Sequence, residues 1–380
     1  MSLEELRKRI DAVDDQLVQL FQERMHIAAE VAEYKAGQGL PVLQPARERE
    51  KLQDVAEKSQ EDLQSYTRVL YSLLFELSRA YQGRIIQRDN ALYSKITQAL
   101  DDTEKMLPAA PSVICQGVEG AYSQLAAEKL FKNPKIMYVN TFEHVFTAIE
   151  KGLCRYGVLP IENSSAGSVK QVYDQMVRRN FHIVRSVRIR VSHNLLAKKE
   201  TCLENIREIY SHEQAIRQCG KFLNTLNGVK VIPCENTAVA ARMVAESGRN
   251  DVAALASANC AELYNLACLM PAVQDEGNNH TRFICIAKNL EIYPGADRTT
   301  LMMILPHKPG SLYKTLARIY ALGINLLKLE SRPLPERDFE FMFYFDLETS
   351  VYSEEFKQLM CELESICEEF HYLGSYLEVV

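Results

Sequence analysis

Apolar side chains recur at alternating spacings of three and four residues along the start of the chain. They are Leu3, Leu6, Ile10, Val13, Leu17, Leu20, Ile27, Val31 and Tyr34. This heptad-like pattern predicts one helix of about 35 residues, roughly 50 Å long at 1.5 Å per residue. Gly37, Gly39 and Pro41 end the pattern. Because so long a helix needs a partner along its length, we expect a homodimer or a higher homo-oligomer.

Two shorter helices are predicted after this break, one near 46–58 and one from about Glu61 to beyond Gln82. The last of these carries leucine and tyrosine side chains on its buried side. The proline-marked stretch LPAAP, at 107–111, ends a linker. We therefore assign an all-α helical domain to 1–90 and a helical linker to 91–111.

Short apolar runs alternate with helical patterns between residues 112 and 290. The runs cover 112–115, 135–139, 156–161, 229–233, 251–256 and 282–287. Helical candidates between them include 123–130 and 141–151. This alternation predicts an α/β domain with largely parallel sheets covered by helices. Its length leaves room for two lobes with a cleft between them.

The last part of the chain, 298–378, follows the order strand, helix, strand, strand, helix, strand. The segments cover 300–306, 310–323, 324–333, 339–348, about 353–369 and 371–380. A βαββαβ order predicts an α+β domain of the ferredoxin-like type. The fold class is thus multidomain, with all-α, two-lobed α/β and α+β parts.

Composition and charge argue against several classes of function but do not indicate a particular one. The net charge of −6 argues against a general binder of nucleic acid or of acidic membranes. The ten cysteines include no CxxC pair, so structural zinc and thioredoxin-like chemistry have little support. We expect no metal and no cofactor. The charged start lacks the apolar core of a secretory signal, and no apolar run reaches membrane-spanning length. We expect a cytoplasmic protein.

Cations interrupt the apolar face of the long helix. Arg24 falls on the heptad seam, and Lys35, three turns further on, shares its face. Such cations are costly unless an anion meets them. Ser78 and Gln82 lie one turn apart on the third helix. From spacing alone, the favoured interpretation is a structural ion pair between Arg24 and Glu48 or another carboxylate.

These residues, together with Arg47, resemble the all-helical chorismate mutase family, whose members form intertwined dimers. The resemblance implies that chorismate, a dicarboxylate, is held for a pericyclic rearrangement to prephenate by positioning and electrostatics. It implies that Arg24 and the partner's Arg7 grip the carboxylates, and that Lys35 and Gln82 bond the ether oxygen. The remaining pocket residues it implies are Gln44, Arg47, Glu48 and Ser78, with Glu48 on the substrate hydroxyl. The family often has Asp where this chain has Gln44.

Four polar motifs mark the α/β part. They are GVEGAYSQLAA at 117–127, LPIENSSAGSV at 159–169, YSHEQAIRQC at 210–219 and NNHTRF at 278–283. The first follows a strand and precedes a helix, with Ser123 as its candidate cap. The second places polar side chains after an apolar strand, where open α/β sheets hold ligands. Taken alone, it is more often a plain polar turn. His212 is more often structural than catalytic.

In this order the motifs resemble the prephenate dehydratase family, which has two α/β lobes like a periplasmic binding protein. The resemblance implies loss of CO₂ and of the ring hydroxyl from prephenate, giving phenylpyruvate. It implies that Thr281 donates to that hydroxyl with help from Glu162. Asn163, Ser164 and Gln218 would hold substrate groups. Arg282 would attract a carboxylate or anchor the cleft.

Two motifs of the last part, KPGSLY at 308–313 and LESRP at 329–333, resemble the ACT domains attached to prephenate dehydratases. The resemblance implies that L-phenylalanine binds as an effector between paired domains. The implied effector residues are Gly310, Ser311, Leu312, Asn325, Glu330 and Ser331. The alternative is that any βαββαβ unit needs a glycine in this turn.

Three interpretations follow for the whole chain. The first is a bifunctional enzyme with chorismate, prephenate and the effector L-phenylalanine as ligands, and with phenylalanine as feedback inhibitor. The second keeps only a dehydratase, acting on prephenate or arogenate, with the helices as a dimerisation module. The third is an amino-acid sensor or binding protein.

Overall fold

The computed structural model describes residues 2–86, 91–334, 341–363 and 366–380. A helical domain comes first, and its bounds are α1 Leu3–Gln38, α2 Pro45–Glu57, the 3₁₀ helix η1 Glu61–Leu63 and α3 Gln64–Ile86. The predicted long helix is confirmed. Ser2 and Glu5 form a capping box at its start, and Gly39 ends it in the left-handed region, at φ 64°.

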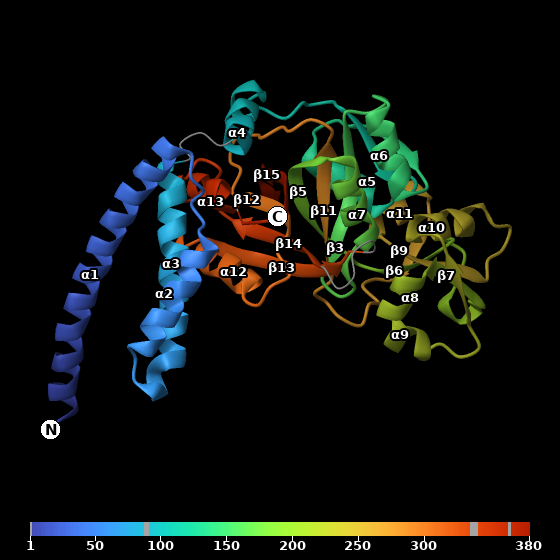
Figure 1. The fold of residues 1–380 in the computed structure, drawn as a ribbon. Helices are drawn as coiled ribbons and strands as arrows, with labels where there is room; N and C mark the ends of the chain where they lie inside the picture. The colour runs from blue at the N-terminus through green and yellow to red at the C-terminus, as the bar shows by residue number, and fades with distance from the viewer. Residues whose placement is uncertain (1, 87–90, 335–340, 364–365) are drawn as a thin grey trace.

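Helix α1 extends beyond the rest of the chain for much of its length (Figure 1). Its apolar seam is exposed there, since Leu17 and Leu20 keep 54% and 62% of their surface. Burial begins near its C-terminal end, at Ala28, Ala32 and Lys35, where α1 packs on α3. The helical domain therefore presents a long uncovered apolar face.

The α/β domain has the two predicted lobes (Figure 1). The first lobe has the sheet order β16-β5-β11-β3-β1-β2, with β4 paired to β3. Its strands are β1 Ser112–Gln116, β2 Lys135–Val139, β3 Tyr156–Asn163, β4 Gly167–Ser168, β5 His182–Arg190, β11 His280–Ala287 and β16 Glu378–Val379. Its helices are α5 Tyr122–Leu130, α6 Phe142–Glu150 and α7 Lys170–Arg179.

The expectation of largely parallel sheets is wrong, because the sheet of each lobe mixes parallel and antiparallel pairs. In the first lobe, strand β1 pairs in parallel with β2 and β3, but β11 runs antiparallel to both β3 and β5. The physical reason is the chain path, because β11 enters this sheet from the second lobe rather than from a crossover helix. Strand β11 is buried from its second residue onward, so it forms the centre of the lobe.

The second lobe lies between β5 and β11 in the sequence and has the sheet order β10-β6-β9-β7-β8. Its strands are β6 Asn194–Ala197, β7 Glu208–His212, β8 Lys230–Cys234, β9 Val252–Ala256 and β10 Ala267–Met270. Its helices are α8 Glu213–Gln218, α9 Gly220–Asn224, α10 Thr237–Glu246, α11 Ala258–Leu263 and the 3₁₀ helix η2 Leu203–Asn205.

The C-terminal domain has the predicted βαββαβ order and the sheet order β13-β14-β12-β15, with antiparallel pairing throughout. Its elements are β12 Arg298–Ile304, α12 Ser311–Ala321, β13 Asn325–Pro333, β14 Phe341–Glu348, α13 Glu354–Leu363 and β15 Glu369–Tyr376. The second helix was expected to reach about 369, but β15 already begins there. The linker helix α4, Ala91–Asp102, packs Ile96 into the core of this domain.

The last predicted strand is divided between two sheets. Strand β15 ends at Tyr376, and β16 then pairs in parallel with β5 of the α/β domain, Glu378 opposite Ser186. Glu378 also forms an ion pair with Arg188 at 2.8 Å. The end of the described chain thus ties the C-terminal domain to the first lobe.

Candidate active sites

A cavity of about 250 Å³ lies among the three helices of the helical domain, and we call it the helical cavity. Its lining is Arg24, Lys35, Val42, Gln44, Arg47, Glu48, Lys51, Phe75, Ser78, Arg79 and Gln82. It gathers all the residues assigned by resemblance to a mutase pocket except Arg7. Arg7 lies 17 residues before Arg24 on α1, about 25 Å along a helix axis. An Arg7 in this site has to come from another chain.

Arg24 and Lys35 of the helical cavity are held by neutral groups. Arg24 donates to the Ser78 hydroxyl and to the carbonyl of Leu74, 3.3 Å away. Lys35 is only 8% exposed, and its Nζ donates to the Val42 carbonyl at 2.7 Å and to Gln82 Oε1 at 3.5 Å. The structural pair of Arg24 with Glu48 is therefore wrong. Burial lowers the pKa of Lys35 and that of Arg24. Two cations of this cavity, Arg24 and Lys35, are thus bonded to neutral groups, and an anion beside them would offset the cost of their burial.

Glu48 has a partner that the sequence analysis missed. Its carboxylate forms an ion pair with Arg79, whose other terminal nitrogen pairs with Glu76. Arg79 directly follows Ser78 on α3 and also lines the helical cavity. Its i,i+3 spacing from Glu76 was a visible signal. Gln44, at the start of α2, makes no side-chain capping bond and lines the cavity.

A second cavity, of about 450 Å³, lies between the two lobes, and we call it the interlobe cavity. The first lobe contributes Ser123, Asn163 and Thr281 to its wall, and the second contributes His212, Gln214 and Gln218 among others. All four sequence motifs thus meet here. Ser123 does not cap α5, whose cap position is Ala121; its hydroxyl donates to the Gln116 carbonyl at 2.8 Å.

Thr281 and Asn163 are directly paired on β11 and β3, and both are buried. Asn163 Oδ1 accepts the backbone N–H groups of Ser165 and Ala166, at 3.1 and 3.0 Å. These bonds orient the amide, so Asn163 Nδ2 donates to the Thr281 hydroxyl oxygen at 2.9 Å. Because that oxygen already accepts a bond, the hydroxyl proton of Thr281 is left to donate elsewhere.

Gln218 bridges the lobes. Its Nε2 donates to the Ser165 hydroxyl at 2.7 Å, and its Oε1 accepts from Asn279 Nδ2 at 3.0 Å. The same oxygen lies 2.9 Å from His193 Nε2. Burial lowers the pKa of His193, which favours the neutral ring. Asn279 and His193 were not assigned roles from the sequence, although Asn279 sits within the NNHTRF motif.

Glu162 and Arg282 are not among the residues that line the interlobe cavity. Successive residues of a strand point to opposite faces, so the neighbours of Asn163 and Thr281 point away from it. Arg282 Nε forms an ion pair with Glu162 Oε1 at 2.8 Å. Ser164 also lies outside the lining, and its hydroxyl donates to the Asn278 carbonyl at 3.1 Å. The sequence-based expectation that Glu162 assists Thr281 is therefore wrong. The two side chains lie on opposite faces of the sheet.

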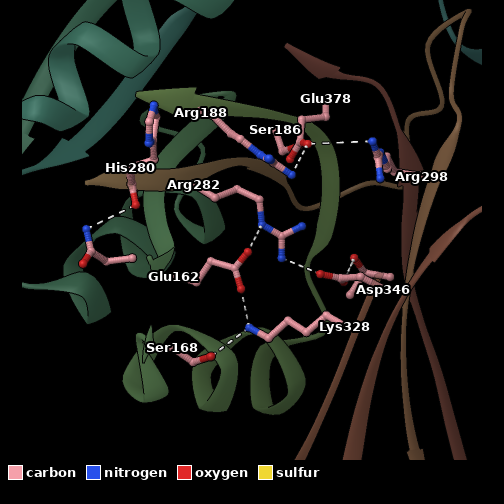
Figure 2. A network of polar contacts seen from close by, with 12 residues as sticks. Glu162, Ser168, Ser186, Arg188, His280, Arg282, Arg298, Lys328, Asp346 and Glu378 are labelled. Atoms are coloured by element: carbon pink, nitrogen blue, oxygen red, sulfur yellow. Dashed lines mark hydrogen bonds and ion pairs between the residues drawn. The ribbon is translucent and has the colours of Figure 1, made fainter. Parts of the chain in front are cut away.

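The pair of Arg282 and Glu162 faces the C-terminal domain (Figure 2). Arg282 forms a buried ion pair with Asp346 of β14, and Lys328 of β13 donates to Glu162 Oε2 at 2.6 Å. Burial alone would lower the pKa of Arg282, but the charge of Asp346 raises it well above its usual value. Strands β3 and β11 thus have the interlobe cavity on one face and the C-terminal domain on the other.

The effector residues assigned by resemblance do not all lie together. Gly310 caps α12 with φ 85°, a conformation that favours glycine, and Ser311 and Leu312 begin the helix. Asn325 Nδ2 donates to Glu348 Oε2 at 2.8 Å. Glu330 instead accepts from Ser168 of the α/β domain and lies 3.2 Å from Lys328, while Ser331 is exposed. Glu330 therefore contacts the α/β domain rather than an open effector site.

Neither a metal site nor a membrane span is found in the part of the chain that the structure describes. Its His, Cys, Asp and Glu side chains form no group of three that could hold a metal ion. Its helices are too short or too polar to cross a membrane.

Comparison with known proteins identifies the family of both domains. The family model for prephenate dehydratase matches residues 113–291, and that for chorismate mutase type II matches 6–83. The bifunctional chorismate mutase/prephenate dehydratase of Aquifex aeolicus (strain VF5) is 31% identical over 98% of this chain and 97% of that protein. Arogenate dehydratase/prephenate dehydratase 2, chloroplastic, of Arabidopsis thaliana is 37% identical over 78% of this chain and 81% of its own.

A solved structure agrees on the prephenate dehydratase fold. Prephenate dehydratase from Arthrobacter aurescens in complex with L-Phe has a TM-score of 0.64 at 24% identity, over 70% of this chain and 89% of that one. The similarity to the Aquifex aeolicus enzyme covers nearly the full length of both chains, so it includes the mutase domain and the dehydratase domain. The chain belongs to the bifunctional chorismate mutase/prephenate dehydratase family and is an enzyme with both activities.

Proposed function

We propose that the helical cavity rearranges chorismate to prephenate with the residues that line it. Arg24 binds a substrate carboxylate, and Glu48 accepts a hydrogen bond from the substrate hydroxyl. Lys35 donates to Gln82 Oε1, which turns the Gln82 N–H groups toward the remaining space. Lys35 and Gln82 then both donate to the ether oxygen, where negative charge develops as its bond to carbon breaks. The observation that carries this proposal is a buried lysine beside Gln82, without a carboxylate bonded to it among the described residues.

The interlobe cavity is the proposed site of dehydration and decarboxylation. Thr281 donates a hydrogen bond from its hydroxyl to the leaving ring hydroxyl, and Asn163 fixes Thr281 by donating to its oxygen. Glu162 lies outside this cavity, but Glu235 lines it and supplies a carboxylate there. Loss of CO₂ makes the ring aromatic and drives the step. Gln218 joins the lobes around the substrate.

Phenylalanine feedback is the regulatory part of the proposal, with the C-terminal domain acting as an ACT domain. No side chain of the residues that the structure describes caps the start of α12, so this helix N-terminus can receive a carboxylate behind Gly310. The buried pair of Arg282 and Asp346 connects this domain to the strand of Thr281. The Arthrobacter aurescens relative was solved with L-Phe. An effector shifts activity only through different affinities for two conformations.

One coupled assay tests this regulation: chorismate is supplied, and phenylpyruvate is measured with and without L-phenylalanine. We expect saturating phenylalanine to lower phenylpyruvate output, and Gly310→Ala to abolish that inhibition, because alanine strains the left-handed turn. Gly323→Ala is the matched control, since Gly323 has φ 68° at the other end of α12. Unchanged output at saturating phenylalanine, or equal loss of inhibition in both variants, would refute feedback at this turn.

The exposed seam of α1 supports a homodimer in which each mutase site takes Arg7 from its partner. Arg7→Ala and Arg24→Ala chains should each have little mutase activity. Co-expressed, they should recover about a quarter of wild-type activity, because half the dimers are mixed and each mixed dimer has one intact site. Chorismate consumption by the purified mixture measures this. Activity no higher than that of the separate variants would show that Arg7 is not shared.

A further inference from the structure

A chain of charged side chains runs from the helical cavity to the C-terminal domain. It begins at Glu48, which pairs with Arg79, and Arg79 pairs with Glu76 on the same helix α3. Arg79 also lines a separate cavity of about 330 Å³ between the helical and C-terminal domains. Arg318 of α12 lines that cavity too. Arg79 therefore lies at the boundary between the mutase site and its neighbouring domain.

Glu76 is held from the C-terminal domain. Lys314 Nζ lies 2.7 Å from Glu76 Oε1, and Arg318 Nη2 lies 3.0 Å from Glu76 Oε2. Both cations are on α12, one turn apart, and Figure 1 shows this helix beside the helical domain. Glu76 and Arg318 are 8% and 7% exposed. Burial alone would raise the pKa of Glu76, but Lys314, Arg79 and Arg318 lower it, so the carboxylate stays ionised.

The geometry limits what Arg79 can do. One terminal nitrogen is used by Glu48, and the other is used by Glu76. With both carboxylates in place, the guanidinium cannot turn into the cavity and pair with the substrate instead. If Glu76 lost its partners on α12, it would no longer hold Arg79 in a fixed position. Glu48, which is paired with Arg79, would then lose its fixed position too. Buried ion pairs are disrupted strongly when one partner is removed.

We propose that Arg79 and Glu76 are positioning residues of the mutase reaction, and that Lys314 and Arg318 of α12 complete the mutase site from outside its domain. This inference rests on the proposed role of Glu48. It assigns the C-terminal domain a part in catalysis by the first domain, in addition to its contact with the dehydratase strands.

The test uses the full-length enzyme and measures mutase and dehydratase kinetics on the same preparations. Arg79→Met should lower mutase kcat/KM by about 10- to 100-fold, the effect of losing a charge-assisted hydrogen bond. Glu76→Gln, and Lys314→Met combined with Arg318→Met, should lower it in the same direction. Arg79→Lys should recover part of the loss. Arg84→Met, on the same helix with its side chain over Tyr81, is the matched control and should leave it unchanged.

A double-mutant cycle separates positioning from general structural damage. In a Glu48→Gln background, Arg79→Met and the α12 double variant should cost little further mutase activity, because the group they position is already gone. Equal losses with and without Glu48→Gln, or wild-type mutase kinetics in Arg79→Met, would overturn the inference. If Glu48→Gln alone leaves the mutase unchanged, the role of Glu48 fails instead. Dehydratase kinetics report folding of each variant.

Discussion

Replacing Thr281 with alanine is expected to lower dehydratase kcat by about 100- to 10,000-fold, the range for removing a general acid or an essential hydrogen-bond donor. The reason lies in the bond from Asn163 Nδ2, which occupies the Thr281 oxygen at 2.9 Å and leaves its proton for the substrate. Alanine removes that proton and leaves a small apolar gap. Phenylpyruvate formation from prephenate measures the loss directly, without the mutase step.

Thr281→Ser is the matched control, because it keeps the hydroxyl and removes a methyl group. It should retain dehydratase activity within about tenfold of wild type, since one lost methyl costs only about 1 kcal/mol. Mutase activity in both variants should equal that of the wild type, which shows that the chain is folded. Dehydratase activity near the wild-type level in Thr281→Ala would exclude Thr281 as the donor.

The orientation of Glu162 explains why Thr281 needs a different neighbour from the one predicted. The sequence places Glu162 next to Asn163, and strand alternation then sends the two side chains to opposite faces. This alternation can be predicted from the sequence of β3 alone. The position of the C-terminal domain behind that face could not be predicted, because nothing local in the PIENS motif shows that Asp346 and Lys328 lie there. Long-range pairing decides which face of a strand is the site.

The elements themselves were largely predictable, because periodicity and glycine breaks are local. The seam of α1, its end at Gly39 and the βαββαβ order of the last domain all agree with the structure. The direction of strand pairing was harder to predict, because an apolar run such as β11 has the same pattern whether it pairs parallel or antiparallel to β3. The pair of Arg79 with Glu48 was missed for a similar reason, since Glu48 reaches Arg79 only when α2 packs on α3, whereas the i,i+3 pair with Glu76 is local.

Removal of the buried lysine of the helical cavity is expected to have the largest effect on the mutase. Lys35→Met keeps most of the side-chain volume but removes the ammonium group, and should lower mutase kcat by about 100- to 1,000-fold, the loss measured when one donor to a developing anion is removed. Gln82→Ala should also abolish most of the activity, because Gln82 is the second donor. Loss of chorismate absorbance measures the rate.

The controls and the pH dependence make this result specific to Lys35. Lys58→Met changes an exposed lysine that pairs with Asp54, and should leave the mutase unchanged. Dehydratase activity should survive in all three variants. Because burial lowers the pKa of Lys35 below its ordinary 10.5, the ammonium is lost on the alkaline side before an exposed lysine would deprotonate. Wild-type mutase kcat should therefore fall as pH rises through that lowered value. A mutase rate that stays at the wild-type level in Lys35→Met would show that the ether oxygen is stabilised by another group.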